Sequence, residues 1–354
     1  SVVWDLDHAW GDGEWMTGRG QRNALDAPIA IYEVHLGSWM RVPEEGGRPL
    51  SYREIAPRLA DHVKRMGFSH VELMPVMEHP NYESWGYQIT GFFAPTSRYG
   101  TPQDLMYLID HLHQRGIAVV LDWVPFHFPA DPHGLCCFDG KRLYEGEGAH
   151  PRWKTHVFNY GRPQVGAFML SSALFWLDKY HADGLRVDAV SSMVYPDYPA
   201  EQEEPGAVDA DHGPMNSEAT AFLRRFNQEV YGSYPGVQTF AEDSKSIPLV
   251  TGPAKDGGLG FNMKWGLGWL HDTLDAYMTK EPRRRRDHHG KLTFPMLDLF
   301  KYNFVLSLSH DEVQPGKGSL LNKMPGDERG KFANVRLFLA YMYAYPGKKL
   351  IFMG

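Results

Sequence analysis

Four carboxylic side chains follow short apolar segments of this 354-residue chain, each near the point where its segment ends. They are Asp122, Asp188, Glu242 and Asp311. Enzymes that hydrolyse or transfer glycosidic bonds need two carboxyl groups flanking the bond, one of them a proton donor. A single charged residue at the end of a strand is structurally ordinary, because the chain must leave the core there. Four such residues at one rim favour glycoside chemistry, although a purely structural origin stays open.

Asp188 and Glu242 are the candidates for the two catalytic carboxyls. Arg186 precedes Asp188 by two positions, so both side chains point to the same side of a strand. We therefore expect the guanidinium to lower the pKa of Asp188 and keep it ionised, as a nucleophile requires. Glu242 has no cation at the equivalent position, which suits a proton donor. Two alternatives remain: Arg186 and Asp188 could form a structural ion pair, and Asp243 could face inward instead of Glu242.

Further polar and aromatic residues near these segments could hold a sugar ring. Asp311 follows His310, and the pair could bind ring hydroxyls and help distort the sugar toward an oxocarbenium-like state. His127, just after the third apolar segment, is another candidate hydroxyl donor, although a lone histidine more often has a structural role. Tyr87 follows a glycine and could present its aromatic face to the ring.

The sequence lacks the motifs of several other enzyme classes. It has no metalloprotease histidine pair, no serine-hydrolase glycine motif and no four-cysteine cluster. Residues 316–319 hint at a phosphate loop, but no strand directly precedes them and the glycine spacing is wrong. The two cysteines, Cys136 and Cys137, are adjacent, and two alone are too few for a metal site or a disulfide framework. We therefore expect no metal and no cofactor.

Eight short apolar segments must position these residues. Each is rich in valine, isoleucine, leucine or aromatic residues and is too short for a typical helix. Their almost continuous apolar character is typical of parallel strands that are buried on both faces. The segments are 29–35, 70–76, 118–124, 185–190, 238–244, 261–265, 305–310 and 349–353, with the weakest pattern at 261–265.

Helix-patterned stretches alternate with these segments, which favours one α/β domain, a (β/α)8 TIM barrel, over two domains. Ser51 and Glu54 form a capping-box pattern, and Thr101 with Pro102 opens another helix. Further helices are expected at 167–180, 218–231, 267–278 and 329–345. Because barrel enzymes carry their active sites at the carboxyl ends of the strands, we expect the four carboxylic residues at that rim.

Residues 29–354 are expected to form this catalytic barrel, apparently truncated after the eighth strand because no eighth helix follows. Residues 1–28 lack the alternating rhythm and are interpreted as a lead-in or linker from a missing N-terminal domain. Long strand-to-helix connections at 125–164 and 191–216 are expected to build the active-site face.

The composition is that of an ordinary globular enzyme, with 43% hydrophobic and 22% charged residues. A net charge of -7 disfavours a nucleic-acid partner, and we expect the one basic run, at residues 283–286, to be a solvated loop. No signal peptide is evident, and the most apolar late stretch, 332–345, is too short to cross a bilayer. We therefore expect a soluble, cytoplasmic protein without a membrane partner.

Six ordered segments carry a resemblance to a known family. They are 31–39 (IYEVHLGSW), 84–88 (SWGYQ), 121–125 (LDWVP), 185–190 (LRVDAV), 241–244 (AEDS) and 308–313 (LSHDEV). With these segments the chain, from about residue 27 to residue 354, resembles the α-amylase superfamily, glycoside hydrolase family 13. Within that superfamily it is most similar to the 1,4-α-glucan (glycogen) branching enzymes.

The resemblance implies that Asp188 is the nucleophile, Glu242 the general acid/base and Asp311 the transition-state carboxylate. The residues that it implies for binding the reacting glucose are Tyr87, Asp122, His127, Arg186 and His310. It also implies retaining transglycosylation, in which α-1,4 links of a donor glucan are cleaved and α-1,6 branches form on an acceptor glucan, as in glycogen biosynthesis.

The resemblance implies no metal, because calcium-binding amylases carry an asparagine where this chain has Phe126. Phe126 also departs from the branching enzymes, which usually have glycine there, and Gln314 is a second departure near the active face. Flanking N-terminal and C-terminal β-domains are implied as well. Two other interpretations stay open: an α-amylase-like hydrolase with the same three carboxylates, and a catalytically impaired glucan-binding protein.

Overall fold

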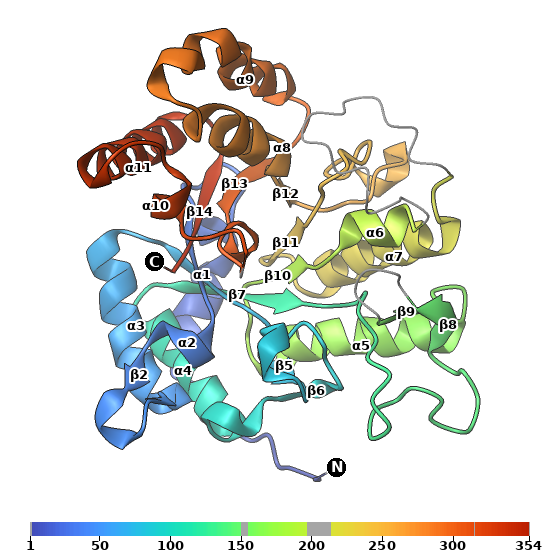
Figure 1. Cartoon of the computed structure of the whole chain (residues 1–354). Coiled ribbons are helices and arrows are strands. Elements are labelled where there is room, and N and C mark those ends of the chain that lie inside the picture. The colour runs from blue at the N-terminus through green and yellow to red at the C-terminus, as the bar shows by residue number, and fades with distance from the viewer. Residues whose placement is uncertain (1, 150–154, 197–213, 315, 354) are drawn as a thin grey trace.

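The computed structural model describes residues 2–149, 155–196, 214–314 and 316–353 of the chain (Figure 1). Eight parallel strands close into a barrel in chain order, and the last strand pairs with the first. They are β1 (Ala30–Val34), β4 (His70–Leu73), β7 (Ala118–Trp123), β10 (Gly184–Val187), β11 (Gln238–Ala241), β12 (Met263–Trp265), β13 (Phe304–Leu308) and β14 (Lys348–Phe352). All eight predicted strands are confirmed, and with them the (β/α)8 fold.

The strands are apolar because both of their faces are covered. Every residue of β4, β7, β10 and β11 is buried, as expected for parallel strands between a packed interior and outer helices. Their register places Arg186 of β10 beside Asp122 of β7. The strand predicted at 185–190 ends at Val187, because helix α6 (Val190–Val194) begins three residues later.

Helices surround the barrel (Figure 1). The predicted capping box of Ser51 and Glu54 at the start of α3 is confirmed, and so is the helix start at Thr101 and Pro102, where Thr101 and Asp104 form a second capping box at α4. The main helices are α3 (Tyr52–Met66), α4 (Pro102–Gln114), α5 (Pro163–Lys179), α7 (Ser217–Ser233), α8 (Leu267–Leu270) and α11 (Glu328–Ala344). The helix predicted at 267–278 changes character after α8 and continues as a π-helix over His271–Met278.

Short elements occupy the connections between strands and helices. They are α2 (Leu36–Trp39), β2 (Arg41–Val42), β3 (Arg48–Pro49), β5 (Met77–Glu78), β6 (Gly91–Pro95), α9 (Gly290–Thr293) and α10 (Leu320–Lys323). The connection at 125–164 also contains an antiparallel pair, β8 (Glu145–Ala149) and β9 (His156–Phe158). The connection at 191–216 contains most of α6, and its residues 197–213 lie outside the described part of the chain.

The basic run at 283–286 is not entirely a solvated loop. It lies in a 3₁₀ helix, Pro282–His288, in which the other three arginines are exposed and Arg285 is buried. The Arg285 guanidinium donates hydrogen bonds to the Met278 carbonyl and to Asn334 Oδ1, both at 2.7 Å. The prediction is therefore wrong for Arg285, because its donors are satisfied inside the fold.

The N-terminal segment contributes a helix, α1 (Gly13–Arg22), that contacts the amino-terminal end of the barrel. The Trp15 indole is 4% exposed and donates to Asp183 Oδ1 at 2.9 Å, just before β10. The Asn23 amide donates to the carbonyls of Asp183 and Gly236, which precede two neighbouring strands. Residues 1–28 thus include an integral part of the barrel's lower face, and their link to a further domain stays a prediction.

No helix in the described residues has both the length and the apolar character needed to cross a membrane.

Candidate active site

The Arg186 guanidinium joins three of the predicted site carboxylates. Its Nη1 lies 2.8 Å from Asp122 Oδ1 and 2.7 Å from Asp188 Oδ1, and its Nη2 lies 3.1 Å from Glu242 Oε2. Strand register explains the arrangement, because β7, β10 and β11 are neighbours and their carboxyl ends meet at one rim. The guanidinium is 1% exposed, so these contacts are sheltered from water. One cation therefore holds three carboxyl groups within a single cluster.

Asp188 keeps one carboxyl oxygen available. Its Oδ1 accepts from Arg186, whereas its buried Oδ2 has no hydrogen-bond partner among the described residues. His127 Nε2 lies 3.5 Å from Oδ2, and His127 Nδ1 in turn lies 3.1 Å from Thr155 Oγ1. An oriented carboxylate with an unbonded oxygen at a strand end can act as a nucleophile.

The expected direction of the pKa shift at Asp188 is wrong. Burial raises the pKa of Asp188 well above its ordinary value, and the nearby Glu242, Asp122 and Asp311 raise it further, while Arg186 opposes them. The spacing in the sequence identified Arg186 as the cation beside Asp188, but it did not show how many carboxylates share this cation. Burial and the neighbouring carboxylates therefore favour a proton on this cluster more than a simple Arg–Asp pair does.

Glu242, not Asp243, faces the cluster. Glu242 Oε2 accepts from the Ala189 backbone N–H at 2.7 Å as well as contacting Arg186. Asp243 instead pairs with Lys264 Nζ at 2.8 Å and accepts backbone N–H bonds of the following turn. The alternative that Asp243 is the inward carboxyl is thereby excluded, and so is the expectation that Glu242 has no cation partner.

His310 and Asp311 form the third side of the site. Glu33 of β1 fixes His310 twice, with its carboxylate accepting from the His310 backbone N–H at 2.9 Å and lying 2.6 Å from Nδ1. Burial alone would lower the pKa of His310, but Asp311 and Glu33 outweigh it and raise the pKa to about 10. His310 is therefore a cationic donor at neutral pH, and it helps to keep the pKa of Asp311 below its ordinary value despite burial.

Tyr87 completes the cluster of predicted residues. Its hydroxyl donates to Asp122 Oδ2 at 2.5 Å, and its ring stacks on His310 with the ring centres 5.2 Å apart. Through these contacts the structure brings together all eight residues that the sequence singled out. Phe126 is fully buried below this face and packs edge-on against the His127 ring.

Several residues of the site were missed or given no role by the sequence reasoning. Glu33 orients His310, Lys264 neutralises Asp243, and Gln314 donates to Asp311 Oδ1 at 2.9 Å.

Glu72 of β4 is fully buried beside Glu33 and has no hydrogen-bond partner in the described residues, and burial raises its pKa well above the ordinary value. The sequence signal that could have identified these residues is a charged side chain inside an otherwise apolar strand. Such a side chain is buried, so it must be neutralised or paired.

A group of side chains that could bind a metal ion lies away from the Arg186 cluster. Among the described residues, one group has the composition and spacing of a metal site, namely Cys136, Cys137 and Glu145 in the connection between β7 and α5. It is separate from the Arg186 cluster in both residues and contacts.

Comparison with known proteins relates the chain to glucan-processing enzymes. The model of the alpha amylase catalytic domain family matches residues 54–134. The 1,4-alpha-glucan branching enzyme GlgB of Aquifex aeolicus is 61% identical over 100% of this chain and 56% of that protein. The enzyme of the same name from Albidiferax ferrireducens is 58% identical with the same coverage. The chain spans about half the length of the curated relatives it matches.

Solved structures support the fold. A Salmonella typhimurium chain named an alpha amylase superposes with a TM-score of 0.70 at 22% identity, over 99% of this chain and 58% of that chain. The alpha-amylase of Geobacillus thermoleovorans, solved with acarbose, gives a TM-score of 0.63 at 17% identity, over 92% of this chain and 70% of that chain. At such identities the likeness establishes the barrel architecture alone.

Proposed function

Because the chain belongs to the family of 1,4-α-glucan branching enzymes, within the α-amylase superfamily, we propose that it carries the catalytic barrel of a retaining transglycosylase. The enzyme cleaves an α-1,4 link of a donor glucan and transfers the released chain to form an α-1,6 branch. One observation carries this proposal: Arg186 contacts both Asp188 and Glu242 and leaves Asp188 Oδ2 without a hydrogen bond from the described residues.

In the first half-reaction, Asp188 Oδ2 attacks the anomeric carbon of the donor and the bond from that carbon to O4 breaks. Glu242, in its protonated form, gives its proton to the leaving O4. A covalent glycosyl ester on Asp188 results. Retaining enzymes hold these two carboxyls about 5 Å apart, and a shared guanidinium is one way to keep them close.

In the second half-reaction, Glu242 acts as the base. It takes the proton from the 6-hydroxyl of an acceptor glucan, and O6 attacks the anomeric carbon while the bond to Asp188 Oδ2 breaks. Asp188 returns to its carboxylate form, and an α-1,6 branch has formed. Attack by water at this point gives hydrolysis instead, so the outcome depends on how the acceptor excludes water.

The remaining residues of the cluster hold the reacting glucose in this proposal. Cationic His310 donates to ring hydroxyls, and the Asp311 carboxylate binds ring hydroxyls and stabilises the positive charge and the distortion of the ring at the transition state. His127 donates to a hydroxyl near Asp188, and Tyr87 presents its ring to the sugar. Donor and acceptor α-1,4-glucans are thus the partners, and a role in glycogen formation inside the cytoplasm remains a prediction.

A branching assay tests the function. The purified protein is incubated with amylose, and iodine staining, new reducing ends and the chain profile after enzymatic debranching are followed together. We expect staining to fall with few new reducing ends, and short side chains to appear after debranching. Rapid release of reducing ends would favour an α-amylase-like hydrolase. Glucan binding without any turnover would favour an impaired binding protein.

The nucleophile assignment has its own control. Asp188→Asn should reduce transfer roughly a thousand-fold or more, because the amide cannot form the glycosyl ester. Asp256→Asn, at an exposed aspartate remote from Arg186, should leave activity unchanged. An Asp188→Asn variant with wild-type activity would contradict the assigned role.

A further inference from the structure

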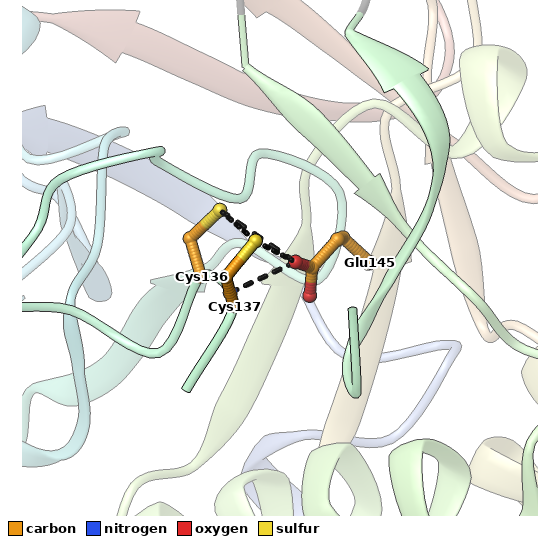
Figure 2. A group of neighbouring side chains, drawn as sticks. All are labelled: Cys136, Cys137 and Glu145. Carbon is orange, nitrogen blue, oxygen red and sulfur yellow. Dashed lines mark hydrogen bonds between the residues drawn. The ribbon is translucent and has the colours of Figure 1, made fainter. Parts of the chain in front are cut away.

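A second group of reactive side chains lies in the connection between β7 and α5 (Figure 2). It consists of Cys136, Cys137 and Glu145, the first residue of β8. One ligand atom from each of the three lies within 4.8 Å of the others. The sequence reasoning counted only the two cysteines and judged them too few for a metal site. Folding brings in a third ligand from eight residues along the chain.

The backbone places both sulfur atoms on the same side. Neighbouring side chains of an extended chain point to opposite faces, so adjacent cysteines do not normally converge. Cys137 adopts a left-handed conformation with φ of 50°, which turns its side chain back toward that of Cys136. The two Sγ atoms lie 4.0 Å apart, and Figure 2 shows both of them facing the Glu145 carboxylate.

The spacing of the three atoms fits one tetrahedral ion. With metal–sulfur and metal–oxygen bonds of about 2.3 and 2.1 Å, tetrahedral zinc places two sulfurs about 3.8 Å apart and a sulfur and an oxygen about 3.6 Å apart. The corresponding distances here are 4.0 Å between the sulfurs, and 3.6 and 3.4 Å from them to Glu145 Oε1. The three ligands therefore form one face of a coordination tetrahedron with little adjustment.

The electrostatics of Glu145 also favour a cation. The residue is 1% exposed, and its carboxylate accepts hydrogen bonds from the Cys137 and Tyr144 backbone N–H groups at 2.9 and 3.2 Å. No lysine or arginine of the described residues forms an ion pair with it. A divalent cation would pair with this buried carboxylate, and it would displace the thiol protons to form the thiolates that bind it.

We propose that Cys136, Cys137 and Glu145 bind one thiophilic divalent cation, with Zn²⁺ as the best match. Thiolate ligands select zinc-like ions over calcium or magnesium, which prefer oxygen. Cys137 is exposed and Cys136 is half-buried, so an ion can enter from solvent and an external ligand can fill the fourth position. The ion ties the 136–137 turn to β8, and β9, the partner of β8, begins beside Thr155, which contacts His127.

Metal titration of the purified protein tests the site without any measurement of glucan activity. The protein is stripped with a chelator under a phosphine reductant, which keeps both thiols reduced, and is then titrated with Co²⁺ and Zn²⁺. We expect one equivalent of Co²⁺ to produce a thiolate-to-cobalt charge-transfer band that Zn²⁺ abolishes. Binding should release protons and raise the Tm of the protein. Absence of the band at saturating Co²⁺ would overturn the proposal.

Variants separate this site from adventitious binding. Cys136→Ser combined with Cys137→Ser should remove the charge-transfer band. Glu145→Gln keeps an oxygen for the Cys137 N–H and both thiols, so the fold should survive while the Zn²⁺ affinity falls ten-fold or more. Glu14→Gln, an exposed carboxylate on α1, is the matched control and should bind like the wild type. An unchanged Zn²⁺ affinity in Glu145→Gln would show that the carboxylate does not bind the ion, and it would overturn the three-ligand assignment.

Discussion

At the scale of single residues, the charge state of Asp188 depends on its neighbours more than on its own chemistry. Arg186 supplies one positive charge, while Asp122, Asp188 and Glu242 compete for it. Burial raises the cost of an unbalanced negative charge, so Asp188 retains its proton to a higher pH than an exposed aspartate does. The titration of this group should therefore be visible in the kinetics.

The acid limb of kcat/KM should lie above the ordinary aspartate pKa of 3.8. Asp188 must be ionised to attack, and its folded pKa is raised, so the active fraction falls as pH drops through that raised value. Removing the neighbouring carboxylate with Asp122→Asn lowers the pKa of Asp188, and the limb should move to lower pH even though the rate also falls. The measurement is a pH profile of glucan transfer for both proteins. A wild-type limb at the ordinary value would contradict the raised pKa.

The members of the site were accessible from the sequence, but their protonation was not. Seven of the eight candidates converge because they lie at or just after strand ends, which share one rim in a barrel, and that rule needs only strand positions; Tyr87 comes from the connection after β4. The direction of the pKa shift at Asp188 was missed because it depends on the burial and number of carboxylates. Glu33 and Lys264 were also given no role, since their partners His310 and Asp243 follow the ends of other strands.

At the scale of elements, α1 and α4 share a buried ionic network. His113, near the end of α4, has Nδ1 2.9 Å from Asp12 and Nε2 2.9 Å from Asp183. Asp183 also accepts from Trp15 of α1 and from the Val119 N–H of β7. Burial alone would lower the pKa of His113, but Asp183 and Asp12 outweigh it and raise the pKa to about 9. The charged imidazolium therefore links the N-terminal segment to the barrel.

This network should make stability fall at alkaline pH. The folded pKa of His113, about 9, exceeds the ordinary value of 6.5, so its contribution is fully present below 6.5 and is lost as pH rises through 9. The free energy of unfolding of the wild type relative to His113→Gln should shrink over this interval, by on the order of 3 kcal/mol. Urea unfolding of both proteins at pH 6, 7.5 and 9 measures it. A difference independent of pH would contradict the charged state.

Elements with strong local signals were predictable, and those stabilised by distant contacts were not. The capping boxes of α3 and α4 and the apolar strands can each be identified from a few consecutive residues. Helix α1 contains three glycines and little apolar character, and its Trp15 contact is with a residue 168 positions away. The β8–β9 pair likewise joins residues up to 13 positions apart, from Glu145 to Phe158, which no short window of the sequence indicates.

At the scale of the whole molecule, β14 closes the barrel. It pairs with β13 on one side and with β1 on the other, from Ala30 beside Lys349 to Glu33 beside Phe352. Leu350, at its centre, is fully buried. Without this strand, two parallel edges and their backbone groups would be exposed to water.

A chain that lacks residues 348–354 should lose its cooperative unfolding transition, although none of the deleted residues belongs to the proposed site. The cause is the loss of both strand pairings together with the burial around Leu350. Calorimetry and near-ultraviolet circular dichroism measure the change. Removal of residues 1–3, whose Val2 and Val3 are exposed, is the control and should leave the transition intact. Retention of a wild-type transition without β14 would contradict the role of closure.

The shared guanidinium of Arg186 also constrains how this site can change over evolution or under design. Because Asp122, Asp188 and Glu242 arrive from three adjacent strands at one cation, the effect of replacing any one of them depends on which of the others remain. Substitutions here are therefore epistatic. New specificities should be easier to reach through the connecting loops, which can vary singly, than through the rim, where a useful change must occur at several strands at once.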